Sequence, residues 1–165
     1  MAAAGPTHPF FIRDAVAGET PVIMEMIRNL ARYEKLEHEV VATTEMLKAA
    51  LFGPTPKVFA LICEVDGQAA GFALCFYSFS TFLGRSGIYL EDLYVEPAYR
   101  GRGIGKAMFR HLARRALAEN CGRIEWNVLN WNAPAIGFYA GLGAVPMTEW
   151  QTQRLTGSAL KALAA

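Results

Sequence analysis

The chain has 165 residues, 53% of them hydrophobic and 19% charged, which excludes a disordered chain and predicts one folded domain. Its formal net charge of +1 argues against a nucleic-acid partner, and without a run of 18 apolar residues no membrane partner is expected. Three cysteines without metal-ligand spacing predict neither a disulfide framework nor a metal site. The first six residues lack the pattern of a signal peptide, so we expect a cytoplasmic protein.

The first half of the chain predicts two helices and a hairpin. The expected elements are a strand at 10–13, a helix from Thr20 to about Lys35, a helix at Glu45–Leu51, and strands at Lys57–Val65 and Gln68–Ser80. Pro21 suits a first helical turn, and apolar residues follow it at helical spacing. The dipeptide Asp66-Gly67 is typical of a tight turn between strands, and Gly71 predicts a bulge or a bend in the second strand.

The second half alternates strands with helices. The expected elements are a strand at Ser86–Val95, a helix at Gly103–Glu119, a strand at Gly122–Leu129, a helix at Ala133–Leu142, and one or two strands within Ala144–Arg154. Hairpin-linked strands followed by crossovers predict an α/β fold, with a mixed sheet and helices on both faces. We expect residues 9–155 to form a single domain, with 1–8 as a loose N-terminal tail and 156–165 as a C-terminal extension.

A glycine-rich turn follows the strand that ends at Val95, and it reads Arg100-Gly101-Arg102-Gly103-Ile104-Gly105-Lys106. Glycines let the backbone approach a ligand, and the first N–H groups of a helix lack internal partners, so the segment predicts a phosphate site. Glycine spacing excludes the Walker-type loop, which would need Gly at position 100 and Ser or Thr at position 107. The spacing also excludes the dinucleotide fingerprint G-x-G-x-x-G. A strand-to-helix turn that merely requires glycine is the alternative.

Three segments resemble the GNAT superfamily of acetyl-CoA-dependent N-acetyltransferases. Arg100–Gly105 is similar to its pyrophosphate motif, residues 132–144 are similar to its second motif N-x-x-A-x-x-F-Y-x-x-x-G-A, and Phe11–Ala15 is typical of its first strand. The resemblance implies a mixed, largely antiparallel central sheet of six to seven strands, with a splayed fourth and fifth strand pair and about four helices on both faces. It also implies acetyl-CoA as co-substrate, no metal, and a homodimer.

A narrower resemblance links the chain to the spermidine/spermine and thialysine acetyltransferases. It rests on Leu30–Glu34, Tyr89–Val95 and Trp131–Pro134, and it implies a small cationic amine as the acceptor. The loop between the second and third strands is shortened here to Asp66-Gly67, and the segment after Ala144 is also shorter, so the identity of the amine stays open. A protein lysine, an N-terminus or an antibiotic amine is the alternative acceptor. A non-catalytic acyl-CoA-binding module is the alternative function.

The resemblance assigns the acetyl-CoA contacts to three segments. The pantetheine arm would pair with the main chain of Leu93, Tyr94 and Val95. The pyrophosphate would lie on the glycine-rich turn, at Arg100, Gly101, Arg102, Gly103, Ile104, Gly105 and Lys106. The second motif would contribute Asn132, Pro134, Ala135, Phe138 and Tyr139. Asn132 is also a good helix N-cap residue.

Acetyl transfer to an amine needs a base for the ammonium proton and an acid for the departing thiolate. The resemblance assigns the base to Glu91, acting through a water, and the acid to Tyr139, whose alternative role is packing. Strand alternation places Glu91 and Asp92 on opposite faces unless a bulge intervenes. Asp92 is then either an acceptor-binding carboxylate or a partner for an arginine.

Carboxylates and aromatic rings suit a cationic acceptor, through ion pairing and cation–π contact. The acceptor-binding residues that the resemblance implies are Tyr33, Glu34, Glu91, Asp92, Glu149 and Trp150. The alternative for Tyr33 and Glu34 is a solvated helix end, because a charge-rich run continues from them to Glu39.

Overall fold

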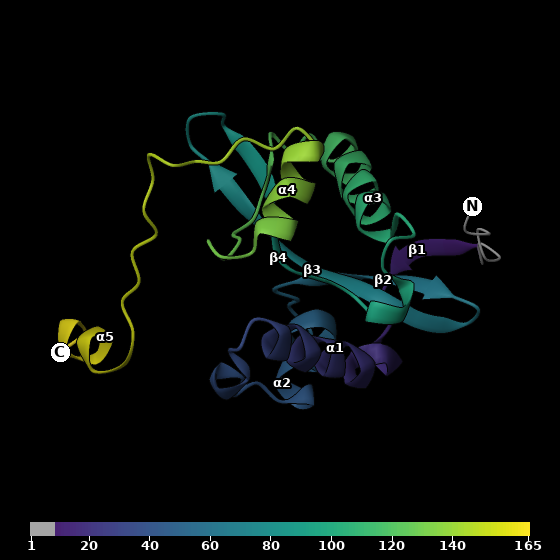
Figure 1. Cartoon of the computed structure of the whole chain (residues 1–165). Coiled ribbons are helices and arrows are strands. Elements are labelled where there is room, and N and C mark those ends of the chain that lie inside the picture. Colours follow the sequence, from purple (N-terminus) through teal and green to yellow (C-terminus); the bar gives the residue numbers. More distant parts are fainter. Residues whose placement is uncertain (1–8) are drawn as a thin grey trace. The chain divides into compact units, whose positions relative to one another are not determined.

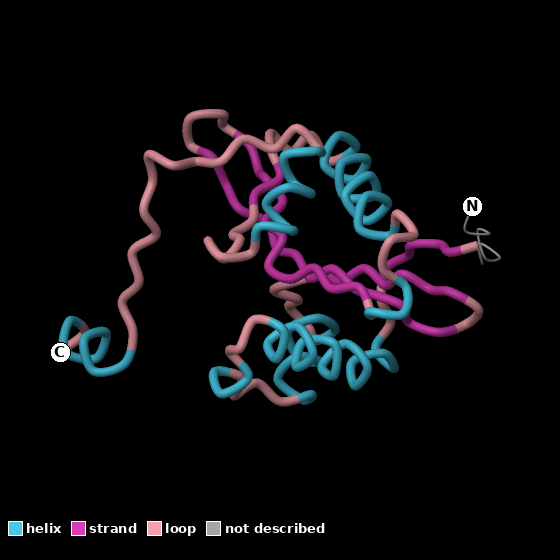
Figure 2. Tube along the Cα trace, in the orientation of Figure 1, coloured by secondary structure: helices cyan, strands magenta, loops and turns pink. Residues whose placement is uncertain are grey.

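The computed structural model describes residues 9–165, so the predicted tail at 1–8 lies outside the described residues (Figure 1). The chain divides into two compact units, whose described parts are 9–127 and 128–165. The first unit holds a five-stranded sheet in the order β1-β2-β3-β4-β5 (Figure 2).

The five strands are β1 (Phe10–Asp14), β2 (Phe59–Val65), β3 (Gln68–Ser80), β4 (Arg85–Val95) and β5 (Ile124–Glu125). The first four strands pair antiparallel with their neighbours, whereas β4 and β5 run parallel. The β2–β3 hairpin turns at Asp66 and Gly67, with φ angles of 50° and 77°. Positive φ at both positions is the backbone of a tight hairpin turn, so the predicted turn is confirmed.

Gly71 lies beside an irregularity of the sheet, as its sequence position predicts. The register of β2 against β3 shifts between Cys63 and Glu64, and Cys63 lies opposite Gly71. A Cβ at Gly71 would stand 2.6 Å from the carbonyl oxygen of Tyr94. Glycine at this position therefore lets β3 approach the end of β4, the strand that carries most of the predicted site.

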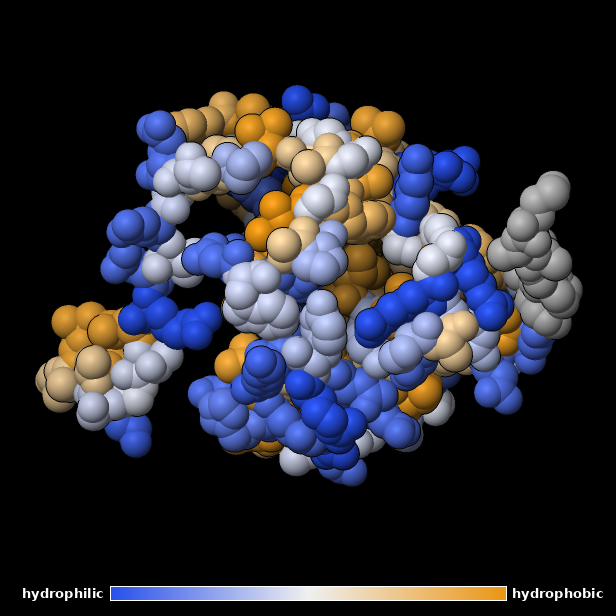
Figure 3. All heavy atoms as spheres, in the orientation of Figure 1, coloured by the Kyte–Doolittle hydropathy of each residue, from blue (hydrophilic) through white to orange (hydrophobic). Residues whose placement is uncertain are grey.

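Three helices of the first unit cover the two faces of the sheet: α1 (Thr20–Tyr33) and α2 (Thr44–Phe52) lie on one face, and α3 (Ile104–Ala118) lies on the other (Figure 1). Pro21 occupies the first turn of α1, and Thr43 caps α2 by accepting a hydrogen bond from Met46 N at 3.2 Å. Hydrophilic residues gather over the outer surface of the α1–α2 layer (Figure 3). This pattern is typical of amphipathic helices packed on a sheet.

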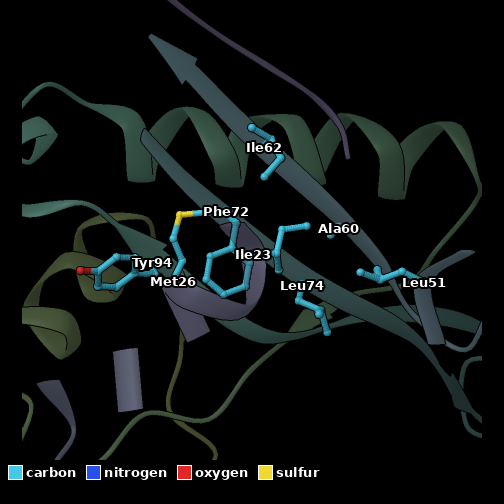
Figure 4. Close-up of a cluster of buried hydrophobic side chains, with 8 residues drawn as sticks. All are labelled: Ile23, Met26, Leu51, Ala60, Ile62, Phe72, Leu74 and Tyr94. Atoms are coloured by element: carbon cyan, nitrogen blue, oxygen red, sulfur yellow. The ribbon is translucent and has the colours of Figure 1, made fainter. Parts of the chain in front are cut away.

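The core between the sheet and α1–α2 fixes the end of β4 to α1. Its buried residues are Ile23, Met26, Leu51, Ala60, Ile62, Phe72, Leu74 and Tyr94 (Figure 4). Tyr94 is 6% exposed, although its neighbours in β4 carry the predicted site. Because Tyr94 is packed into this core, the last residues of β4 are anchored against α1 rather than free to move.

The second unit contains α4 (Ala133–Gly141) and α5 (Gly157–Leu163). Asn132 caps α4, because its side-chain oxygen accepts a hydrogen bond from Ala135 N at 3.3 Å. Pro134 lies in the first turn, where its missing N–H costs no helical hydrogen bond. The predicted capping role of Asn132 is therefore confirmed.

The α/β fold class is confirmed, with differences in the strands. The described residues form five strands instead of six or seven, since Gly122–Leu129 is reduced to Ile124–Glu125 and no strand forms within 144–154. Pairing between β4 and β5 covers only Ile88 and Tyr89 of β4, because β5 is two residues long, so the rest of β4 has no β5 partner. The predicted C-terminal extension contains α5, which was not expected.

The three cysteines are buried in the first unit, as expected. Burial raises the pKa of the Cys63 thiol to about 11 and that of the Cys75 thiol to about 12, so both are protonated at neutral pH. In the part of the chain that the structure describes, none of the helices is both long and apolar enough to cross a membrane.

Candidate active site

The glycine-rich turn connects β4 to α3 with two residues in the left-handed region. Gly101 has a φ of 75°, and Gly103, the N-cap of α3, has a φ of 82°. A Cβ at either glycine would project into open space, with no atom within 4 Å. The first N–H groups of α3 lie at the positive end of its dipole. An open turn that exposes backbone amides fits a pyrophosphate, and an additional side chain would reduce that space.

Replacing Gly101 with Ala tests whether this open backbone binds phosphate. The left-handed φ costs an L-residue roughly 1–2 kcal/mol, and the new methyl group would occupy the open side of the turn. We expect CoA affinity, measured by calorimetry, to fall about tenfold, or roughly 1.4 kcal/mol. Gly84→Ala is the matched control, because Gly84 has a φ of 64° and open surroundings in the β3–β4 turn. Equal CoA affinity in both variants would contradict a phosphate site at Gly101.

The two arginines of the turn make different contacts. Arg100 donates from Nε to the carbonyl oxygen of Val95 at 2.8 Å. Its guanidinium carbon lies 5.6 Å from the ring centroid of Tyr33 and 5.5 Å from that of Tyr94. Arg102 donates to the carbonyl oxygen of Ala98 at 3.2 Å, and its guanidinium carbon lies 5.2 Å from the Tyr99 ring centroid. Arg102 therefore remains within its own loop, whereas Arg100 reaches helix α1.

A bulge in β4 determines where the two strand carboxylates lie. Leu74 of β3 lies opposite Asp92, but the next residue, Cys75, lies opposite Leu90. Glu91 is therefore an extra residue without a direct partner on β3. An extra residue reverses the alternation of side chains beyond it, so the strict alternation of a regular strand does not apply at Glu91 and Asp92.

The bulge brings both carboxylates to the α1 face of the sheet. Directly opposed residues share a face, so Asp92 lies on the face of Leu74, which belongs to the core under α1. Residues two apart in a strand share a face, so Phe76 lies on the face of Leu74, and so does Tyr89, which pairs with Phe76. Glu91 is two residues beyond Tyr89 in β4 and therefore lies on that face as well. Both carboxylates consequently face α1, and the expectation of opposite faces for a regular strand is corrected.

The electrostatics show that Glu34 of the α1 C-terminus is near the two strand carboxylates. Burial, followed by the charges of Glu91 and Glu34, raises the pKa of Asp92 to about 6. Burial also raises the pKa of Glu34. Because the negative charges of Glu91 and Glu34 disfavour ionisation of Asp92, a cation bound beside Asp92 would be stabilised. The described residues contain no group of His, Cys, Asp or Glu side chains suited to a metal ion.

Replacing Asp92 with Asn is expected to stabilise the fold at neutral pH. With an unfolded pKa of 3.8 and a folded pKa of about 6, the wild-type protein loses stability as pH rises between these values. At pH 7.5 we expect the variant to be more stable by about 1–2 kcal/mol, after discounting for the partial exposure of Asp92. Thermal unfolding at pH 7.5 and pH 3.5 measures this, and the difference should disappear at pH 3.5. A less stable Asp92→Asn variant at pH 7.5 would contradict the repulsion.

The remaining predicted residues belong to the second unit. Tyr139 lies near the end of α4, half-buried, with its ring centroid 5.4 Å from that of Phe138. Glu149 and Trp150 lie outside helices and strands, and Trp150 is 73% exposed. The structure thus groups Tyr33, Glu34, Glu91 and Asp92 with the turn in the first unit. It places Asn132, Pro134, Ala135, Phe138, Tyr139, Glu149 and Trp150 in the second.

One part of the site was missed by sequence reasoning. Glu96 directly follows the strand predicted to end at Val95, and its carboxylate accepts from Tyr94 OH at 3.3 Å and from Asn29 Nδ2 at 3.3 Å. Asn29 in turn accepts from Arg32 Nη1 at 2.8 Å. The only local signal was a carboxylate directly before Pro97, which is common at strand ends.

Comparisons with known proteins agree with this geometry. A model of the acetyltransferase (GNAT) family matches residues 23–144. A thialysine N-epsilon-acetyltransferase from Bos taurus is 40% identical over 164 residues, covering 93% of this chain and 96% of the relative. An L-ornithine N5-acetyltransferase from Arabidopsis thaliana is 30% identical over 197 residues, covering 92% and 86%. The structure of an integron cassette protein from V. cholerae has a TM-score of 0.78 at 26% identity, covering 94% and 97%.

The first unit combines a mixed sheet, in which β4 and β5 pair in parallel, with a glycine-rich turn that leads into α3. The chain belongs to the GNAT acetyltransferase family. It is therefore an enzyme of the acetyltransferase class, and that family uses acetyl-CoA as its acetyl donor.

Proposed function

We propose that this enzyme transfers an acetyl group from acetyl-CoA to a primary amine of a small cationic acceptor. The observation that carries the proposal is the grouping of Glu34, Glu91 and Asp92 on one face of the first unit, close to an open phosphate-type turn. Carboxylates in this number attract an acceptor with one or more ammonium groups. Polyamines, thialysine and ornithine all have this chemistry, and the named relatives act on the last two.

The residues of the turn and the second motif would hold the co-substrate. The amides from Gly101 to Lys106 would bind the pyrophosphate, and β4 beyond Tyr89, which has no β5 partner, would pair with the pantetheine arm. The carbonyl oxygen of Val95 is less available to the pantetheine arm, because it already accepts a hydrogen bond from Arg100. Acetyl-CoA supplies the activated thioester, and the protein supplies position, which can lower the barrier by about 7–11 kcal/mol at best.

Two side chains would move protons. An alkylammonium has a pKa of about 10.4, so at pH 7.4 forming the neutral amine costs roughly 4 kcal/mol. Glu91 would accept this proton through a water, which its exposure allows. As the amine nitrogen forms its bond to the acetyl carbon and the carbon–sulfur bond breaks, Tyr139 would donate its hydroxyl proton to the departing sulfur.

A CoA-release assay across a panel of amines tests the proposal. The panel holds spermidine, putrescine, thialysine, ornithine, an aminoglycoside and a lysine peptide. We expect turnover on at least one small acceptor with two or more charged groups, and much slower turnover on the peptide. Fast turnover on the peptide alone would instead favour a protein lysine as the acceptor, and fast turnover on the aminoglycoside alone would favour an antibiotic amine. Tight acetyl-CoA binding with no turnover on any amine would leave a non-catalytic acyl-CoA-binding module. The homodimer that the family resemblance implies and the cytoplasmic location expected from the first residues both stay predictions.

A further inference from the structure

Arg100 joins three elements of the first unit through one guanidinium group. It lies in the glycine-rich turn, hydrogen-bonds the carbonyl oxygen of Val95 at the end of β4, and packs against Tyr33 at the end of α1. The ring of Tyr94 lies at a similar distance, 5.5 Å, from the same guanidinium carbon. Planar guanidinium groups stack on aromatic rings in a way that lysine does not reproduce.

Hydrogen bonds to Glu96 also connect the end of β4 with α1. Tyr94 OH and Asn29 Nδ2 both donate to the carboxylate of Glu96, each at 3.3 Å. Asn29 belongs to the last turns of α1, so the end of β4 and the end of α1 are joined twice. Tyr33 and Glu34, at that end of α1, are the residues expected at the acceptor amine.

We propose that Arg100 is a positioning residue that transmits the binding of acetyl-CoA at the turn to the acceptor end of α1. The inference rests on the proposed function for the identity of the ligand at the turn. A ligand bound at residues 100–106 would hold the guanidinium in place, and the guanidinium carbon lies 5.6 Å from the ring centroid of Tyr33, the residue next to Glu34. Arg100 would thus make the amine site complete only when the donor is present, and the two ligands would bind with positive coupling.

Hydrogen exchange with CoA as the probe tests the link without turnover. In the wild-type protein, we expect CoA to slow exchange in a peptide covering residues 28–36. In Arg100→Lys, which keeps the charge and loses the planar stacking group, CoA should still bind by calorimetry but no longer slow exchange there. Arg85→Lys is the matched control, because Arg85 lies outside the turn and hydrogen-bonds Asn120 Oδ1 at 3.2 Å, and it should preserve the effect on residues 28–36.

Steady-state kinetics give a second measurement. Arg100→Lys should raise the amine KM about three- to tenfold, the range expected when exposed cation–π contacts and a charged hydrogen bond are lost. The acetyl-CoA KM should change less. Tyr33→Leu should raise the amine KM similarly, and the double variant should be no worse than either single variant, because both remove the same link.

The outcomes separate this inference from the proposed function. CoA binding to the wild-type protein without slower exchange in residues 28–36 overturns the inference alone. Multiplicative effects of the two substitutions on the amine KM also overturn it, since they would show independent roles. If CoA does not bind to the wild-type protein at all, the proposed function fails and the inference fails with it. Thermal unfolding of each variant distinguishes these results from loss of folding.

Discussion

Tyr139→Phe is expected to lower kcat about a hundredfold or more, with the acetyl-CoA dissociation constant unchanged. The substitution removes one hydroxyl and keeps the aromatic ring, which packs 5.4 Å from the Phe138 ring within α4. Without a proton donor, the thiolate must leave unprotonated, and the cost appears only in the transition state. Such a loss lowers kcat and kcat/KM together. Free thiol release under saturating amine gives kcat, and calorimetry gives the dissociation constant.

Tyr77→Phe is the matched control for this prediction. Tyr77 donates its hydroxyl to Glu119 at 2.6 Å, so the control also loses one phenolic hydrogen bond, between β3 and the end of α3. We expect lower stability and an unchanged kcat for Tyr77→Phe. If Tyr139→Phe behaves in the same way, Tyr139 is a packing residue and the general-acid role is wrong.

Glu91→Gln is expected to lower kcat/KM for the amine about a hundredfold at pH 7.4, and the loss should shrink as pH rises. Without the base, the reaction depends on the small fraction of amine already neutral in solution. That fraction grows about tenfold per pH unit until the amine pKa near 10.4 is approached. A pH profile of kcat/KM from 7 to 10 for both proteins measures this convergence.

The control for Glu91 is Glu125→Gln on the adjacent strand. Glu125 lies opposite Tyr89 in the parallel pairing and forms an ion pair with Arg123 at 2.7 Å. Its replacement removes a nearby negative charge outside the proposed machinery, and the profile should match that of the wild-type protein. A constant loss in Glu91→Gln across the whole pH range would instead assign Glu91 to acceptor binding, with the proton leaving by another route.

The elements with local signals could be predicted from the sequence. The Asp66-Gly67 turn, the proline in the first turn of α1 and the Asn132 cap of α4 depend on backbone preferences of a few adjacent residues. The last strands could not be predicted reliably, since a strand forms only where a partner edge lies alongside. Only Ile124 and Glu125 of the expected strand at 122–129 have such a partner, because β4 pairs with β5 at just two positions.

The family and the glycine-rich turn could be predicted from the sequence alone, because the glycines and their spacing encode a local backbone conformation. The sequence also named Glu91, Asp92 and Glu34 as candidate acceptor residues. Their common position on one face of the sheet depends on contacts between segments that are distant in sequence. The bulge at Glu91 arises from pairing with β3, a segment distant in sequence, and it turns both strand carboxylates toward Glu34. The position of Arg100 against Tyr33 depends equally on the packing of α1 over the end of β4, which no local pattern specifies.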